Sequence, residues 1–137
     1  MIIDATDLLL GRMASHAAKA ALLGQQVDIV NCERAVISGR AKDIIARYRQ
    51  RRERGYPYKG PFFPKQSDRL VRRTVRGMLP YKKEKGSSAF KRVMCWKGIP
   101  EQFKEKKMER FADCQADKLP NEQYMTIGQL CIHLGGK

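Results

Sequence analysis

The sequence predicts an α/β fold, and two observations carry this prediction. Short runs of branched apolar residues alternate with longer segments whose apolar residues recur at helical spacing, a pattern typical of a mainly parallel sheet covered by helices. The chain has 137 residues and 42% apolar content, which suits one domain. We therefore expect residues 1–137 to form a single three-layer α/β/α domain around a mainly parallel sheet of about four strands, with basic helical and loop extensions.

The first third of the chain supplies three predicted strands and a helix. Residues 2–3 are branched and apolar and indicate a short buried strand. Residues 8–23, rich in Ala and Leu and followed by Gly24, indicate a helix that crosses back over this strand. The β-branched runs at residues 27–30 and 35–37 predict two further strands. The chain therefore begins with a predicted βαβ unit.

A second helix is predicted to begin after Arg40. Ala41, Ile44, Ile45 and Tyr48 give its first half an apolar side for packing, but residues 49–54 are charged or polar all round. A helix that buries no face has no packing reason to persist, so we expect this end to leave the body and lie in a phosphate-rich surface. A frayed end in solvent is the alternative.

Residues 55–65 (GYPYKGPFFPK) predict a stiff, irregular loop because they contain three prolines and two glycines. The aromatic residues of this loop leave two interpretations open. They could stack on unpaired bases, helped by the adjacent lysines. They could instead fold onto the apolar side of the next helix, and we favour this packing role.

The helix predicted from Ser67 to the residue before Pro80 has two opposed faces. Ser67 is expected to cap its start, Asp68 to place a favourable carboxylate in its first turn, and Pro80 to end it. At 100° per residue, one face is a stripe of guanidinium groups that we expect to point outward, and the other face is apolar. The stripe consists of Arg69, Arg72, Arg73 and Arg76, and the apolar face of Leu70, Val71, Thr74, Val75 and Met78.

The rest of the chain completes the predicted domain. Residues 86–88 (GSS) indicate a flexible turn, residues 89–92 a short basic helical turn, and residues 93–96 a strand that closes the sheet. The segment from Lys97 to Asn121 alternates in charge and is expected to wrap an edge irregularly.

A last helix is expected after Thr126, which can cap it. The apolar positions of this helix recur at i, i+3, i+4 and i+7, and Gly135-Gly136 is expected to end it. These positions are Ile127, Leu130, Cys131 and Leu134.

The net charge of +14 is far more than solubility requires, and it is concentrated in one part of the chain. Residues 40–92 contain 18 lysines and arginines but four acidic residues, whereas the remaining residues contain ten of each sign. A neutral body with a basic central block predicts a defined contact surface for a polyanion, and nucleic acid is the natural partner. The aromatic and basic loop favours a folded RNA over a regular duplex.

Several function classes are not supported by the sequence. The four cysteines form no C-x-x-C pair, so we expect buried thiols rather than zinc ligands or disulfides, and the two histidines are interpreted as ordinary imidazoles. No nucleotide-binding glycine motif and no acid–base or nucleophile constellation is found, so we expect no enzyme, cofactor, metal or small-molecule substrate. The start of the chain does not resemble a signal peptide, and the longest helix-like apolar stretch, residues 13–23, is too short to span a membrane. We therefore expect an intracellular protein without a membrane partner.

Three motifs carry a resemblance to a known family. They are residues 11–15 (GRMAS), residues 31–39 (NCERAVISG) and, most specifically, residues 75–80 (VRGMLP). Through them the chain resembles, over essentially its whole length, the universal large-subunit ribosomal protein family numbered thirteen. The Gly60-Pro61-Phe62 loop and the Gly98-x-Pro100 turn look like the archaeal branch of that family.

The resemblance implies a non-enzymatic structural constituent of the large ribosomal subunit, located in the cytoplasm in the ribosome. It would bind large-subunit ribosomal RNA beside neighbouring ribosomal proteins and support subunit assembly. A free regulatory RNA-binding protein is the alternative, and an RNA-processing enzyme is a weaker rival. The expected RNA-binding residues are Arg40, Arg47, Arg49, Arg51, Arg52, Arg54, Lys59, Lys65, Arg69, Arg72, Arg73, Arg76, Lys82, Lys83, Lys85, Lys91 and Arg92.

Overall fold

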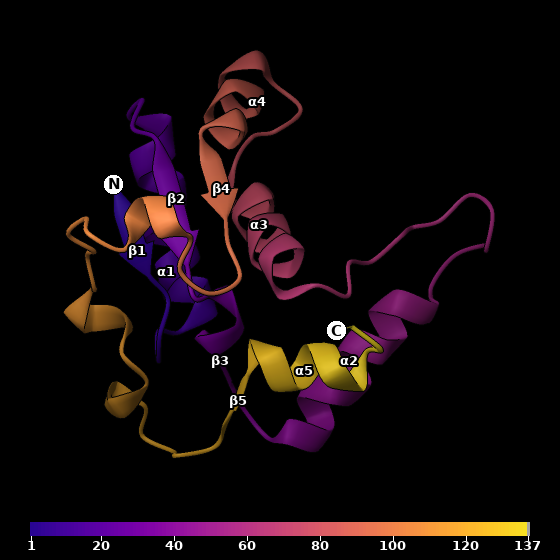
Figure 1. The fold of residues 1–137 in the computed structure, drawn as a ribbon. Coiled ribbons are helices and arrows are strands. Elements are labelled where there is room, and N and C mark those ends of the chain that lie inside the picture. The colour runs from indigo at the N-terminus through magenta and orange to yellow at the C-terminus, as the bar shows by residue number, and fades with distance from the viewer. Residues whose placement is uncertain (137) are drawn as a thin grey trace.

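A three-stranded parallel sheet lies at the centre of the protein, whose residues 1–136 are described by a computed structural model (Figure 1). Its strands, in the order β1-β2-β4, are β1 (Ile2–Asp4), β2 (Val27–Val30) and β4 (Val93–Cys95). In the register of the sheet Ile3 lies opposite Ile29, which in turn lies opposite Cys95, and all three are buried. The predicted mixed α/β class with a mainly parallel sheet is thus confirmed.

The strand predicted at residues 35–37 lies in a second sheet. It is β3 (Val36–Ser38), which pairs antiparallel with β5 (Tyr124–Thr126), so that Ile37 lies opposite Met125. A parallel neighbour in one sheet needs a crossover of about a dozen residues or more. The connection between β2 and β3 is much shorter and consists mainly of a 3-10 turn, Cys32–Arg34, so β3 cannot become a fourth strand of the central sheet.

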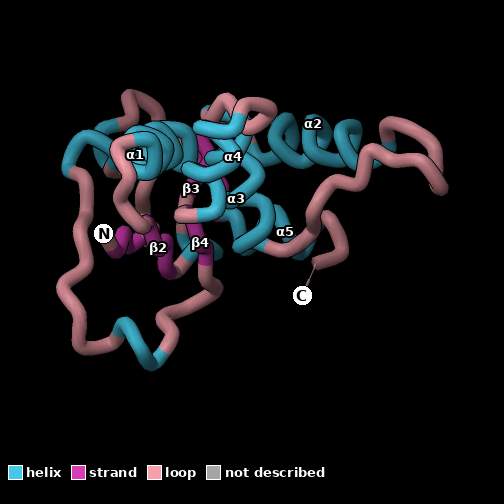
Figure 2. Tube along the Cα trace, turned by 90° about the horizontal axis from the view of Figure 1, so that it is seen from above, coloured by secondary structure: helices cyan, strands magenta, loops and turns pink. Residues whose placement is uncertain are grey.

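Five α-helices accompany the sheets, namely α1 (Leu10–Leu22), α2 (Ala41–Glu53), α3 (Ser67–Met78), α4 (Glu84–Lys91) and α5 (Ile127–His133). Helix α1 packs against both α3 and α4 and covers the central sheet, as Figure 2 shows from above. Its buried positions are mostly alanines, which allow close packing against α3. None of the helices described in residues 1–136 is long and apolar enough to cross a membrane.

Helix α1 begins two residues later than the sequence predicts. The backbone groups of the residues before it are already used by other segments, because Val36 donates to the carbonyl of Leu8 at 2.9 Å and Leu9 donates to that of Cys114 at 2.7 Å. The Leu8 carbonyl is thus occupied and does not accept a helical hydrogen bond, whereas the Leu9 carbonyl accepts the first one from the Met13 amide at 3.0 Å. The helix therefore starts at Leu10.

The two faces of α3 agree in part with the prediction. Leu70, Val71 and Val75 are fully buried, as expected, whereas Met78 is 40% exposed. The predicted Ser67 cap is wrong, because Gln66 occupies the cap position without a side-chain hydrogen bond and Ser67 is a buried first residue of the helix. Asp68 lies in the first turn, as predicted. The end agrees with the prediction: Leu79 is extended, as expected for the residue before a proline.

The flexible turn predicted at residues 86–88 is instead helical. These residues belong to α4, and Gly86 is buried there. A Cβ atom at Gly86 would overlap the carbonyl group of Pro80. The glycine therefore allows a close backbone approach between α4 and the start of the α3–α4 connection, and flexibility is not its role.

The C-terminal part agrees closely with the prediction, except that strand β5 was not expected. Thr126 caps α5 in a reciprocal arrangement: its hydroxyl accepts from the Gln129 amide, and the Gln129 side chain accepts from the Thr126 amide, each at 3.3 Å. All four predicted apolar positions of α5 are buried. The preceding segment is irregular as predicted, with 3-10 turns at Glu101–Phe103, Ala112–Cys114 and Ala116–Lys118.

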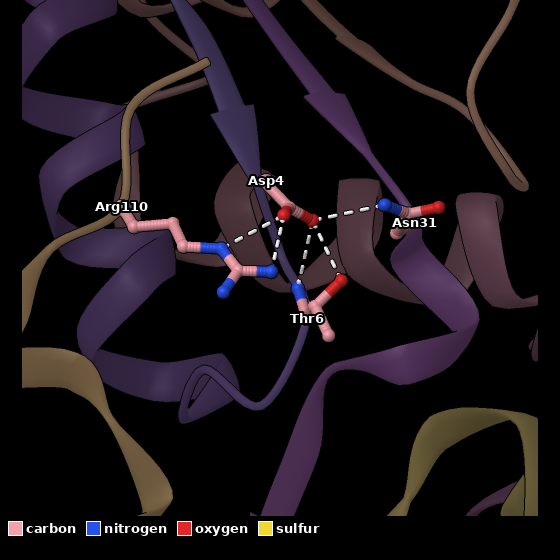
Figure 3. A network of polar contacts seen from close by, with 4 residues as sticks. All are labelled: Asp4, Thr6, Asn31 and Arg110. Carbon is pink, nitrogen blue, oxygen red and sulfur yellow. Dashed lines mark hydrogen bonds and ion pairs between the residues drawn. The ribbon is translucent and has the colours of Figure 1, made fainter.

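A polar network around the buried carboxylate of Asp4 holds this irregular segment to the sheet (Figure 3). One carboxylate oxygen of Asp4, at the end of β1, accepts from the amide and hydroxyl of Thr6 and from the side-chain amide of Asn31, which follows β2. The other oxygen accepts two hydrogen bonds from Arg110. Every acceptor site of the buried carboxylate is thus engaged.

Candidate nucleic-acid interface

The four arginines predicted as a stripe on α3 do share one face. They line an open groove of about 420 Å³ together with Pro64, from the preceding loop, and Phe90, from α4. Arg69 is exposed, but the other three arginines are half-buried rather than pointing freely outward. Contacts within the protein explain this correction.

Three of these guanidinium groups lie over aromatic rings from three different segments. Arg72 lies 4.6 Å from the ring centroid of Phe90, Arg73 lies 4.6 Å from that of Phe63, and Arg76 lies 5.1 Å from that of Tyr81. A cation over an aromatic face is attracted by the ring, and the contact restricts the rotamers of the long side chain.

Two of the ring-backed arginines also donate hydrogen bonds to backbone carbonyls. The Nε of Arg72 donates to Val93 in β4 at 3.0 Å, and an Nη of Arg73 donates to Phe62 at 3.2 Å. A guanidinium has five N–H donors, so each group keeps several donors for an external acceptor. The α3 stripe is therefore a set of positioned cations with unused donors.

The cations of α2 and α3 influence each other. Burial, and then the neighbouring charges of Arg76 and Arg51, lower the pKa of the Arg73 guanidinium. Arg51 belongs to α2, so like charges from two helices meet here, and a bound anion would relieve their repulsion. The site is electrostatically suited to phosphate groups.

The second half of α2 extends from the body, as predicted (Figure 2). Its buried residues, Ile44 and Tyr48, lie in the first two turns, and the side chains from Arg49 onward are exposed. Two contacts hold this end, since Arg51 lies over the Tyr48 ring at 5.2 Å and Arg52 donates a hydrogen bond to the Leu134 carbonyl at the end of α5.

The loop after α2 divides its aromatic residues between two roles. Phe63 is half-buried and packs edge-on against Tyr48, with ring centroids 5.7 Å apart. Tyr56, Tyr58 and Phe62 are exposed, so the favoured packing role is wrong for these three residues. Figure 1 shows that the far end of this loop projects away from α3.

The remaining predicted cations flank the stripe on both sides. Helix α3 lies between α4 and α2 in Figure 1, and we call the basic residues of these three elements and of the segments that join them the basic face. Arg92 is partly engaged, because it donates to the Ala21 carbonyl at 3.3 Å. The flanking residues are all exposed: Arg40, Arg47, Arg54, Lys59, Lys65, Lys82, Lys83, Lys85, Lys91 and Arg92.

Sequence reasoning missed a polar cluster outside the basic face. His16 of α1 stacks on Phe111, with ring centroids 4.4 Å apart, and forms a hydrogen bond of 2.8 Å with Asp113, whose other oxygen accepts from the Cys114 thiol at 3.5 Å. The potential metal-ligand atoms of His16, Asp113 and Cys114 lie within 4.8 Å of one another. Within residues 1–136, no other group of three or more His, Cys, Asp or Glu residues comes this close together. No local spacing signals it, because His16 and Asp113 are 97 positions apart.

The chemistry of this cluster favours a structural contact. Burial, together with the Asp113 carboxylate, raises the pKa of Cys114 to about 11, whereas a nucleophilic or metal-binding cysteine needs a thiolate. The hydrogen bond from His16 lowers the pKa of Asp113. We therefore interpret the three residues as a link between α1 and the irregular segment.

Fold and surface first define a class: a small α/β protein with one strongly basic face, of the kind that suits a polyanion. The family model described as "Ribosomal protein L13" matches residues 1–102. The chain therefore belongs to the ribosomal protein L13 family, which confirms the resemblance found in its motifs.

Three relatives that match nearly the whole chain are archaeal, as the loop and turn motifs suggested. The large ribosomal subunit protein uL13 of Methanosarcina barkeri is 42% identical over 137 residues, covering 99% of this chain and 98% of the relative. The protein of the same name from Methanocaldococcus jannaschii is 42% identical over 140 residues, with the same coverage. That of Archaeoglobus fulgidus is 37% identical over 135 residues, covering 98% of this chain and 86% of the relative.

Proposed function

We propose that this protein is a structural constituent of the large ribosomal subunit that binds large-subunit ribosomal RNA through its basic face and supports subunit assembly. Its site of action would be the ribosome in the cytoplasm, beside neighbouring ribosomal proteins. The names of its archaeal relatives support the ribosomal role. The proposal assigns the protein no catalytic activity, cofactor or small-molecule substrate.

The observation that carries the proposal is the set of ring-backed arginines on α3. A guanidinium held over a ring has already lost much of the rotamer freedom that binding would otherwise cost. Arginine also matches the geometry of phosphate oxygens through paired N–H donors. Three such groups on one helix, with exposed cations of α2 and α4 on either side, suit the phosphate backbone of a folded RNA.

Sedimentation of a cell lysate tests the assignment to the ribosome. Tagged wild-type protein is expected to co-migrate with large subunits through a sucrose gradient, with little in the free pool. A predominantly free pool would favour the alternative of a regulatory RNA-binding protein. Turnover of RNA by the purified protein would favour an enzyme.

A matched pair of variants tests the basic face itself. Replacing Arg47 and Arg49 by Glu changes two exposed residues of α2, and replacing Lys107 and Lys118 by Glu makes the same charge change outside the basic block. The first variant should be depleted from large subunits, and the second should be incorporated like the wild type. Equal incorporation of the two variants contradicts the proposed contact surface.

Salt dependence measures the number of phosphates bound. If about ten phosphates are neutralised, the slope of log affinity against log salt should be on the order of −7 to −9. The measurement requires the purified protein and ribosomal RNA at several salt concentrations. An affinity that hardly changes with salt concentration would contradict the proposal of a phosphate-binding surface.

A further inference from the structure

The loop after α2 carries three large aromatic side chains in solvent. Tyr56 is 60% exposed, Tyr58 is 85% exposed and Phe62 is 71% exposed. We call these three residues the aromatic tip. Exposing rings of this size gains nothing for folding, because burying apolar surface is what stabilises a fold. A partner that covers them would account for their position.

The backbone of the loop is ordered by its own hydrogen bonds. The amide of Tyr56 donates to the Gly60 carbonyl at 3.0 Å, and the amide of Gly60 donates to the Tyr56 carbonyl at 2.8 Å. The closure requires a glycine at position 55, where φ is +94° and a Cβ would overlap the Gly60 carbonyl. Because these hydrogen bonds already order the backbone, a ligand would pay less conformational entropy than it would on a flexible loop.

Both ends of the loop are fixed to the basic face. On one side Arg54 is the cap residue of α2, and on the other Phe63 lies under Arg73 of the α3 stripe. Within the tip, the rings of Tyr56 and Tyr58 lie 5.8 Å apart and are inclined by 53°. The aromatic tip is thus attached to the cationic surface at both ends.

The charges around the tip select the kind of partner. Residues 54–65 contain Arg54, Lys59 and Lys65 and no acidic residue. Aromatic rings beside cations match a ligand that has flat apolar faces and phosphate groups at short intervals, as unpaired nucleotides do. A regular RNA duplex offers phosphates but keeps its base faces stacked, so it would leave the rings unused.

We propose that the aromatic tip is a stacking platform for unpaired bases of RNA, with Tyr58 as its principal ring and Arg54 and Lys59 on the adjoining phosphates. This assignment rests on the proposed RNA binding and adds the structural class of RNA that is recognised. It requires a bulge, a loop or an end of the RNA to lie against residues 56–62.

Two RNA probes of equal length separate stacking from phosphate binding. One is an unstructured single strand, the other a blunt duplex, and binding of the full-length protein to each is measured by fluorescence anisotropy. Tyr58→Ala is expected to weaken single-strand binding by about 5- to 150-fold, the range found for loss of one stacking ring. Duplex binding and the salt slope should stay unchanged, because no charge is removed.

Two further variants control the experiment. Tyr58→Phe keeps the ring and should bind the single strand like the wild type, and Tyr124→Ala removes an exposed tyrosine far along the chain in β5 and should change neither affinity. The melting temperature of each variant checks its fold. Equal single-strand and duplex effects of Tyr58→Ala, or no effect on either, overturn the stacking role. No binding of either RNA by the wild type refutes the proposed function itself, and the stacking role with it.

Discussion

The carboxylate of Asp4 accepts hydrogen bonds from Nε and Nη2 of Arg110, at 2.8 Å and 2.6 Å. The two residues are 106 positions apart, and their contact holds the irregular segment against the end of β1. Burial by itself would raise the pKa of Asp4, but the hydrogen bonds from Asn31, Thr6 and Arg110 outweigh it and lower the pKa to about 2. The carboxylate is therefore stabilised in its charged form.

This pKa predicts that the fold loses stability in acid through Asp4. The pKa of Asp4 in the folded state lies below the ordinary pKa of an aspartate, so the stabilisation is present above pH 4 and is lost as the pH falls towards 2. The shift corresponds to about 2 kcal/mol of unfolding free energy. Urea unfolding between pH 6 and pH 3 measures the unfolding free energies of the wild type and Asp4→Asn. The difference between these two free energies should become smaller as the pH falls.

A control for this titration lies in the same irregular segment. Asp117 is exposed, and Asp117→Asn should change the unfolding free energy by less than about 0.5 kcal/mol at every pH. If the difference in unfolding free energy between the wild type and Asp4→Asn stayed constant from pH 6 to pH 3, the ionic role assigned to the network would be contradicted.

Two glycines in helices predict opposite effects of the same substitution. An added Cβ at Gly86 overlaps the Pro80 carbonyl, so Gly86→Ala should destabilise the protein by about 2 kcal/mol or more. Gly77 lies in α3 with open space around it, and Gly77→Ala should stabilise by about 0.5–1 kcal/mol because alanine is the better helix former. Thermal unfolding of both variants decides the matter, and a neutral Gly86→Ala would show that α4 can shift away from residue 80.

The capping box of α5 gives a prediction about local stability. Thr126→Ala removes the hydroxyl that accepts from the Gln129 amide and should cost about 1 kcal/mol. Because both side chains belong to one reciprocal arrangement, Gln129→Ala combined with Thr126→Ala should cost less than the sum of the single changes. A double-mutant cycle by urea unfolding measures this coupling, and strict additivity would mean that the two bonds are independent.

Sequence periodicity predicted the elements that depend on local patterns. The buried face of α3 at Leu70, Val71 and Val75 follows from helical spacing, and the strands of the central sheet follow from their branched residues. Strand β5 was missed because three residues, of which Tyr124 is exposed, give too short an alternation to recognise.

Contacts between distant segments could not be predicted from such patterns. The ring beneath Arg72 comes from Phe90, and the guanidinium that donates to Asp4 comes from Arg110. No spacing rule in the sequence connects either pair of positions. The same limit explains the error at residue 86, where the sequence shows a glycine beside two serines but cannot show that a carbonyl lies against it. Charge was predictable in amount and position along the chain, whereas the way each cation is held was not.

The last prediction compares two arginines of the α3 stripe, of which one is expected to stabilise the fold and both are expected to bind RNA. Arg72 donates to the Val93 carbonyl and lies over Phe90, so Arg72→Gln should lower the unfolding free energy by about 1–2 kcal/mol. Arg69 is exposed and has no hydrogen bond or ion pair within residues 1–136. Arg69→Gln should therefore change the unfolding free energy by less than about 0.5 kcal/mol.

Both substitutions remove one positive charge from the groove, and under the proposed function each should reduce the salt slope of RNA binding by about one. Urea unfolding and salt titrations of the two variants measure the two effects separately. If Arg72→Gln left stability untouched while weakening RNA binding, the contacts with Val93 and Phe90 would not be supporting the fold. If neither variant changed the slope, the stripe would not be contacting phosphates.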